Sequence, residues 1–208
     1  MKTLPPLTRV LLLASLVLLI SCSSGATGIS SVPKSPSSVA SPIIYNASPP
    51  PLGVVPTTCD PPLSQTRDFF KQNNTDTSTH PNALGEAGVW AIGFRGPNAT
   101  LLTQYQNQYG YGAKIVWFVD KEKVKEPIVV TGTNVQTGRP LVFFTTGKEE
   151  ASREMKLDPR FPNHPISVAG PNWSEWGSEI YYPTAGCYRL AATWKRGTWS
   201  YVIAAGSQ

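Results

Sequence analysis

The stretch YRLAATWKRGTWSYVI, residues 188–203, predicts a β-hairpin. In its first half, every second residue falls on one face of an extended strand: Tyr188, Leu190, Ala192 and Trp194. In its second half, the same spacing puts three large residues on one face: Trp199, Tyr201 and Ile203. The segment Lys195–Thr198 lies between the two halves, and its glycine suits a tight turn. Two half-buried strands joined in this way indicate an antiparallel sheet.

Short apolar runs of the same kind occur earlier in the chain and are bounded by Gly or Pro, as strands usually are. They are Trp90–Phe94, Ile115–Val119, Ile128–Val130 and Leu141–Phe144. Glu149–Leu157 is the one segment that tolerates a helix, and only a short one. Many short strands separated by Pro and Gly are typical of an all-β sandwich or barrel.

The region 59–208 has the length of one domain, long enough to bury a sizeable core. The whole chain has 208 residues and a formal net charge of +5, but Lys2, Arg9 and Lys34 precede this region. It therefore carries fifteen basic and thirteen acidic residues. No dense Lys/Arg stripe occurs in it, so we expect no nucleic-acid partner.

The first residues have the features of an export signal. Lys2 and Arg9 give a positive start, the apolar run Val10–Ile20 follows, and Ser21 precedes Cys22. An apolar core this short predicts a secretory signal and not a membrane span. A small residue before a cysteine at the cleavage point resembles a bacterial lipobox. We expect residues 1–21 to be a lipoprotein signal peptide and Cys22 to carry acyl chains that anchor the protein in a membrane. The alternative is an ordinary signal peptide of a secreted protein.

The next segment predicts a disordered tether, so that Cys22 and the tether together form residues 22–58. Ser23–Thr58 contains nine serines, seven prolines and a single charge, Lys34. Such a segment cannot bury enough apolar surface to offset its ordering entropy. Fully extended, it would reach about 110 Å at ~3.1 Å per residue. It is either a spacer that lifts the domain off the membrane or a leader with no required length.

Two cysteines remain once Cys22 is assigned to lipid, Cys59 and Cys187. Disulfides persist outside the cytoplasm, and only one pairing is available, so we expect a Cys59–Cys187 bridge. If Tyr188 and Leu190 face the core, Cys187 points away from it or lies at the entrance of its strand. The bridge would then fix the start of the domain to an edge or rim of the sandwich.

Two segments resemble an uncharacterised family of small bacterial surface lipoproteins. The first is YYPTAGCYRL, residues 181–190, followed by Thr198–Ile203, and the second is Tyr109–Gly112 before Lys114–Trp117. The family has an aromatic-Pro-x-x-Gly-Cys-Trp segment before its last two strands, and this chain has Tyr188 in place of the Trp. The resemblance implies an immunoglobulin-like antiparallel β-sandwich and a surface location. It implies no activity and no catalytic residues.

No motif for enzymatic chemistry is visible. His80 and His164 both lie in loop-like stretches beside prolines. No nucleophile elbow, zinc-protease helix or phosphate-binding glycine loop occurs. Glu175 and Glu179 could form a carboxylate pair but are more often surface charges. We therefore expect no enzyme activity, no cofactor and no metal site.

Aromatic residues are the candidates for ligand binding. Trp173 and Trp176 lie in the polar, turn-rich segment 171–177, and Tyr109 and Tyr111 lie in a segment rich in Gln and Asn that also holds Tyr105. Aromatic faces beside amide side chains suit a sugar ring or a protein interface. The alternative is that these rings cap the ends of the core.

Two functions remain open. The domain is either a tethered binding module for a cell-wall glycan or an envelope protein, or a structural or sensory ectodomain without a ligand pocket. An exposed patch formed by the four candidate rings would favour the binding module. A hydrolase is a distant third hypothesis.

Overall fold

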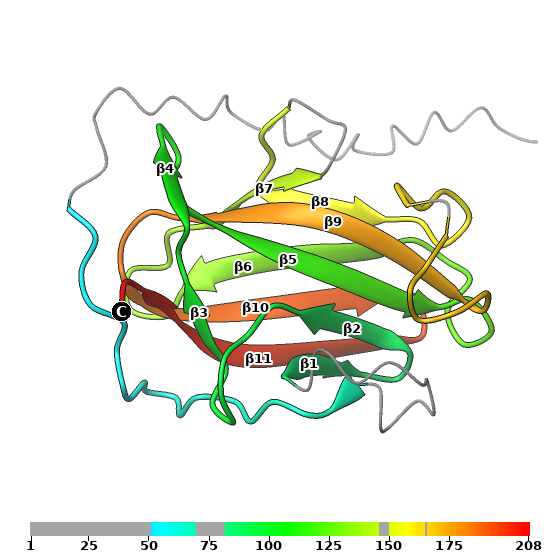
Figure 1. The fold of residues 1–208 in the computed structure, drawn as a ribbon, viewed down its shortest axis with the longest axis horizontal. Helices are drawn as coiled ribbons and strands as arrows, with labels where there is room; N and C mark the ends of the chain where they lie inside the picture. The colour runs from blue at the N-terminus through cyan, green and yellow to red at the C-terminus, as the bar shows by residue number, and fades with distance from the viewer. Residues whose placement is uncertain (1–50, 70–81, 146–149, 165) are drawn as a thin grey trace, which may run out of the picture. The chain divides into compact units, whose positions relative to one another are not determined.

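A computed structural model describes residues 51–69, 82–145, 150–164 and 166–208. The predicted signal peptide, Cys22 and the tether up to residue 50 lie outside the described residues, as does His80. The described ranges form eleven β-strands in two sheets (Figure 1). No helix in these ranges is long and apolar enough to span a bilayer.

The first sheet, the β5–β9 sheet, has the order β1-β2-β5-β9-β7, with β4 also paired to β5. All its pairs are antiparallel. Its strands are β1 (Ala83–Glu86), β2 (Val89–Ile92), β4 (Tyr105–Asn107), β5 (Gly110–Asp120), β7 (Val142–Thr145) and β9 (Trp173–Tyr182).

The second sheet, the β10–β11 sheet, has the order β3-β11-β10-β6-β8. Its pairs are antiparallel except for β3, which runs parallel to β11. Its strands are β3 (Thr100–Leu102), β6 (Ile128–Asn134), β8 (Glu154–Leu157), β10 (Gly186–Trp194) and β11 (Gly197–Gly206).

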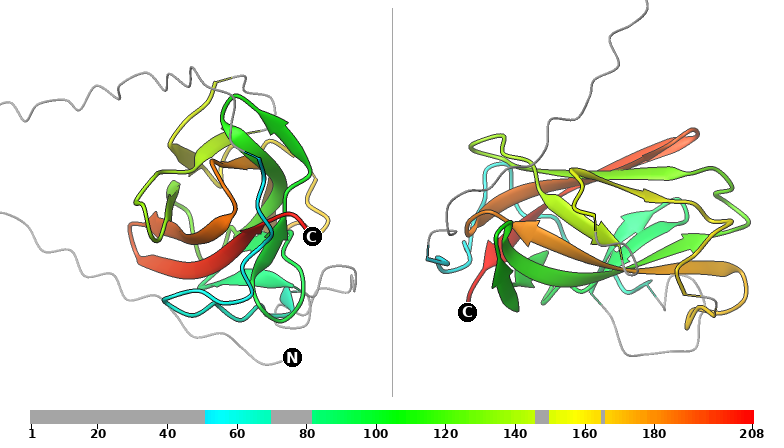
Figure 2. Two further views of the ribbon diagram at one scale, coloured as in Figure 1. Left: turned by 90° about the vertical axis from the view of Figure 1, so that its left-hand side faces the viewer. Right: turned by 90° about the horizontal axis from the view of Figure 1, so that it is seen from above.

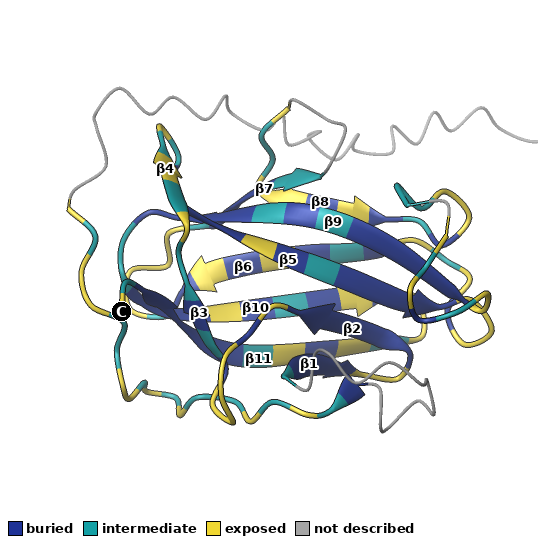
Figure 3. Cartoon of the chain, in the orientation of Figure 1, coloured by how far each residue is buried: buried dark blue, intermediate teal, exposed yellow. Residues whose placement is uncertain are grey.

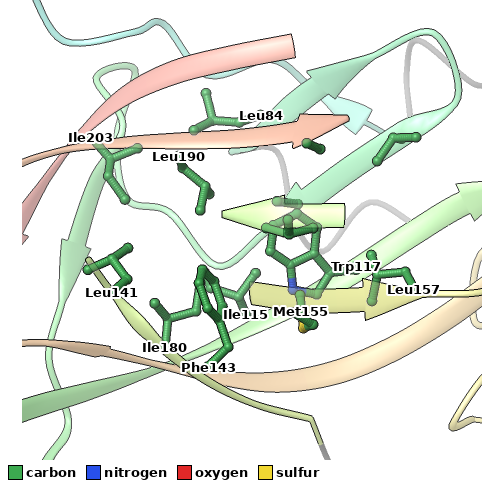
Figure 4. Close-up of a cluster of buried hydrophobic side chains, with 14 of the residues drawn as sticks. Leu84, Ile115, Trp117, Leu141, Phe143, Met155, Leu157, Ile180, Leu190 and Ile203 are labelled. Atoms are coloured by element: carbon green, nitrogen blue, oxygen red, sulfur yellow. The ribbon is translucent and has the colours of Figure 1, made fainter. Parts of the chain in front are cut away.

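The two sheets pack against each other (Figure 2). They enclose one main core, to which both contribute side chains (Figure 4). The alternation predicted for the closing hairpin is present: β10 and β11 pair up to Trp194 and Gly197, with Lys195 and Arg196 as the two-residue turn. Buried strand segments stand out beside the exposed turns in Figure 3. The all-β sandwich predicted from the sequence is confirmed, and its sheets are antiparallel apart from the β3–β11 pair.

The helix allowed at Glu149–Leu157 was a wrong expectation, because Glu154–Leu157 forms strand β8. Met155 and Leu157 are buried in the main core, while Glu154 and Lys156 point to solvent. This period of two fits a strand, and β6 supplies the partner, with Val130 opposite Met155. A short apolar-polar alternation without its partner strand does not distinguish the two structures.

The predicted disulfide is confirmed: Cys59 and Cys187 are bonded, with their Cα atoms 5.8 Å apart. Cys187 is the second residue of β10 and lies on the face opposite the main-core residue Tyr188. The bridge therefore lies at the rim, as predicted, but on an interior strand and not on an edge strand. Closing a loop of this length contributes at most about 4–5 kcal/mol by chain entropy.

Ordered pairing begins before Cys59, in residues that the sequence assigns to the tether. The amide of Val55 donates to the carbonyl of Ser207 at 3.0 Å, and the amide of Ser207 donates to Gly53 at 3.1 Å. Further along, the amide of Ser64 donates to Val202 at 2.9 Å. The N-terminal segment is thus hydrogen-bonded to the last strand and its C-terminal extension.

Candidate functional site

Three of the four predicted binding residues are buried. Trp173, Trp176 and Tyr111 are 8%, 2% and 5% exposed, respectively. The segment 171–177, expected to be an exposed connection, contains the first residues of β9, which is paired along its whole length with β5. The exposed aromatic patch expected from the sequence is therefore not formed by these residues.

The two tryptophans lie in different hydrophobic clusters. Trp176 belongs to the main core, between the sheets. Trp173 lies in a second cluster on the outer face of the β5–β9 sheet, where Phe69 covers it. The Phe69 ring stacks on Phe118 and meets Trp173 edge-on, each with ring centroids 5.0 Å apart. This outer face was not predicted to be covered.

Tyr109 remains partly exposed, at the tip of the β4–β5 hairpin. Asn107 and Gly110 pair at the end of this hairpin, which leaves Gln108 and Tyr109 as its turn. The Asn107 side-chain oxygen accepts a hydrogen bond from the Tyr109 amide at 2.8 Å and so fixes the turn. Tyr109 is therefore presented by a short, hydrogen-bonded loop.

Tyr109 is one member of an aromatic group that we call the tyrosine cluster. Its four rings come from β4, the β4–β5 turn, β7 and β9: Tyr105, Tyr109, Phe144 and Tyr181. Tyr181 contacts the other three, and Tyr109 also contacts Phe144, with centroids 5.3 to 6.2 Å apart in these pairs. Tyr181 is buried beneath the others, while Tyr105, Tyr109 and Phe144 are partly exposed. The cluster lies on the outer face, because the neighbours Ile180 and Tyr182 point into the main core.

A glycine makes room for this cluster. Gly112 pairs with Tyr105 on one side and with Tyr181 on the other. A Cβ atom at Gly112 would lie 2.3 Å from the Tyr105 ring. The absence of a side chain therefore lets the Tyr105 ring lie over β5 and reach Tyr181 across it.

One carboxylate lies within the tyrosine cluster. The Tyr181 hydroxyl donates a hydrogen bond to Glu179 Oε2 at 3.0 Å. Burial, with the charge and hydrogen bond of Glu179, raises the pKa of Tyr181 to about 12. Burial and the charge of Glu179 also raise the pKa of Tyr105. Both phenols are therefore neutral at physiological pH and can act as hydrogen-bond donors.

Exposed amides surround the cluster. Gln104, Gln106 and Gln108 all lie on or beside β4 and are exposed. Planar rings, amides and a carboxylate acceptor form the combination expected of a surface that contacts sugar rings and their hydroxyls. The sequence drew attention to Tyr105 and the glutamines but missed Phe144 and Tyr181. The alternation within β7 and β9 could have identified these two residues. Each directly follows a core residue, Phe143 or Ile180, and therefore points to the other face of the sheet.

The carboxylates considered for catalysis have other roles. Glu175 is 9% exposed, and its Oε2 accepts a hydrogen bond from the Val168 amide at 2.9 Å. Glu179 accepts from Tyr181, as described above. Within the described ranges, no three His, Cys, Asp or Glu side chains are grouped so that they could hold a metal ion.

No protein-family model and no curated protein matches the sequence. Among solved structures, the chain is similar to the ASH/PapD-like domain of human CEP192 (PapD-like domain 7). The sequence identity is 6%, the match covers 60% of this chain and 90% of that chain, and the TM-score is 0.26. A TM-score this low carries no argument about topology or function.

The burial of the two tryptophans can be tested by stability. Trp173→Ala and Trp176→Ala should each lower the free energy of unfolding by about 3–5 kcal/mol, because each leaves a cavity in a packed cluster. Phe161→Ala is the control, since this ring is 74% exposed and its loss should change stability by less than about 0.5 kcal/mol. Urea unfolding followed by tryptophan fluorescence measures all three. Two tryptophan variants as stable as the Phe161 control would contradict the burial.

Proposed function

We propose that this chain is a lipid-anchored extracytoplasmic lipoprotein whose β-sandwich binds a cell-wall glycan through the tyrosine cluster. The anchor rests on the sequence, where an apolar export signal ends at Cys22 and a Ser/Pro-rich segment follows. The Cys59–Cys187 bridge supports the location, because disulfides persist outside the cytoplasm.

The observation that carries the binding function is the partly exposed tyrosine cluster. Three of its rings are accessible on one outer face, and a fourth, Tyr181, supports them from below. Flat aromatic faces pack against the apolar faces of sugar rings, while the Glu179 carboxylate and the glutamine amides can pair with sugar hydroxyls. An envelope protein is the other partner that such a surface could take.

The second candidate is a structural or sensory ectodomain in which the same rings only seal the outer face. Trp173 and its neighbours favour it, because they form a comparable aromatic group on the same sheet that is buried by the chain itself. The two candidates differ in what Tyr109 does. In the binding module its ring contacts the ligand, whereas in the structural ectodomain it contributes to stability alone.

The anchor is tested by substituting its cysteine. Cys22→Ser removes the thiol that would carry the diacylglycerol, so metabolic labelling with a fatty-acid analogue should label the wild type and not the variant. The Cys59→Ser variant is the control for loss of a thiol elsewhere and should retain the label. Equal labelling of the wild type and Cys22→Ser would refute lipidation at this residue.

The binding surface is tested at Tyr109. In cosedimentation of the detergent-solubilised full-length protein with purified peptidoglycan, Tyr109→Ala should weaken binding by about 2 kcal/mol, as for the loss of a central aromatic contact. Tyr109→Phe keeps the ring face and should retain most of the binding. Phe161→Ala removes an exposed ring at another site and should bind like the wild type.

Melting temperatures of the same variants separate the two candidate functions. For the binding module, Tyr109→Ala melts within a few degrees of the wild type and loses peptidoglycan. A Tyr109→Ala variant that melts far below the wild type supports the structural ectodomain. The wild type could instead fail to bind peptidoglycan and capture an envelope protein that Tyr109→Ala does not capture. That result would show that the partner is a protein and not a glycan.

A further inference from the structure

One edge of β5 has no partner strand along its middle residues. β9 pairs with one edge of β5 from Tyr111 to Asp120. The other edge is shared by two short strands, since β4 pairs with Gly110–Gly112 and β2 pairs with Val116–Val119. The residues between them, 113–115, are paired with neither strand on that edge.

A cavity of about 480 Å³ lies at this open edge. One wall is the end of β2 and the residues after it, 92–95, and another is the crossing from β3 to β4, residues 101–104. Ala113 and Lys114 of β5, together with Asn82 just before β1, complete the lining. Three lining residues belong to the main core, so part of the surface is apolar: Phe94, Leu101 and Ala113. The volume lies in the range of pockets for small ligands.

The backbone at the end of β2 gives the cavity its shape. Gly93 has φ +136°, and a Cβ atom there would lie 2.8 Å from the Lys114 carbonyl oxygen. Only a glycine lets the chain pass this close to β5 and then turn away from it. Beyond the turn, the Arg95 amide donates to the Thr100 carbonyl at 2.7 Å, which fixes the backbone that carries the Arg95 side chain.

The cavity is positively charged. Arg95 and Lys114 line it and are exposed, and no carboxylate belongs to the lining. Neither cation forms an ion pair with a residue in the described part of the chain. The register places Glu179 opposite Lys114, but the two side chains form no ion pair, and the Glu179 carboxylate instead accepts the Tyr181 hydroxyl. Two cations on the lining, neither held in an ion pair within the described ranges, indicate a site for an anion.

A polar side chain beside the cations completes the site. Thr103 lines the cavity, but its hydroxyl oxygen is buried, has no hydrogen-bond partner among the described residues and exposes almost no surface to a ligand. The exposed amide of Gln104 lies next to Thr103 in the sequence and also lines the cavity.

We propose that this cavity binds a small anionic ligand the size of one sugar ring, with its carboxylate or phosphate held by Arg95 and Lys114. The ring's apolar face packs on the floor that Phe94, Leu101 and Ala113 form, and its hydroxyls pair with the exposed amide of Gln104. An arginine fork suits either anion. This site adds a ligand class to the proposed function, and it uses neither the lipid anchor nor the tyrosine cluster.

The test is isothermal titration calorimetry of the detergent-solubilised full-length protein with D-glucuronate, D-glucose 6-phosphate and D-glucose. We expect at least one of the two anionic sugars to bind and glucose to bind at least about tenfold more weakly. Binding of glucuronate alone would identify a carboxylate ligand, and binding of glucose 6-phosphate alone would identify a phosphate ligand. Binding of both would show that the site recognises the negative charge that they share. Added salt should weaken the binding.

Variants assign the binding to this cavity. Arg95→Gln and Lys114→Gln should each weaken binding of the anionic sugar about tenfold without lowering the melting temperature, because both side chains are exposed. Arg189→Gln removes an exposed cation from the other sheet and should have no effect. Tyr109→Ala should also leave this binding unchanged, which separates the cavity from the tyrosine cluster.

Three results would overturn the proposal. The first is no heat of binding with either anionic sugar up to about 10 mM, a concentration well above the dissociation constants of useful small-ligand sites. The second is equal binding of glucose and the anionic sugars. The third is an affinity unchanged in both Arg95→Gln and Lys114→Gln.

Discussion

The stacking of Trp117 on Trp199 joins the two sheets of the sandwich. The indole planes are 7° from parallel, with centroids 6.2 Å apart. Trp117 Nε1 donates to the Ser178 hydroxyl at 2.8 Å, and Trp199 Nε1 donates to the Val89 carbonyl at 3.0 Å. Because each buried donor has a partner, neither indole carries the cost of an unpaired polar group. The pair fixes β5 of one sheet against β11 of the other, and other features of the domain are built around β5.

Both faces of β5 and its partly unpaired edge contribute to the cores and candidate sites of the domain. Its inner face contributes Ile115 and Trp117 to the main core, and its outer face contributes Phe118 to the cluster beneath Phe69. Further along the outer face, Gly112 admits the tyrosine cluster, and the open edge beside Lys114 borders the cationic cavity. Both candidate sites therefore depend on how β5 is held, although neither includes a residue of the Trp117–Trp199 pair.

Local patterns in the sequence predicted the fold well and the sites poorly. Alternation and the glycine beside the turn identified the closing hairpin. The count of cysteines left after Cys22 identified the Cys59–Cys187 bridge. The burial of Trp173 was missed because its cover, Phe69, is distant in the sequence. The cavity could not be foreseen, because it arises from two strands that pair with different parts of one edge of β5. Alternation shows that a strand has two faces but not what covers each one.

The central claim is that the Trp117–Trp199 contact couples the two sheets, and a double-mutant cycle tests it most directly. The measurement is the free energy of unfolding of Trp117→Leu, Trp199→Leu and the double variant, with the disulfide oxidised. A stacked pair predicts that the double variant is more stable than the sum of the single losses implies, by about 0.5–1.5 kcal/mol. Losses that add to within about 0.3 kcal/mol would show that the two rings act independently and would contradict the account.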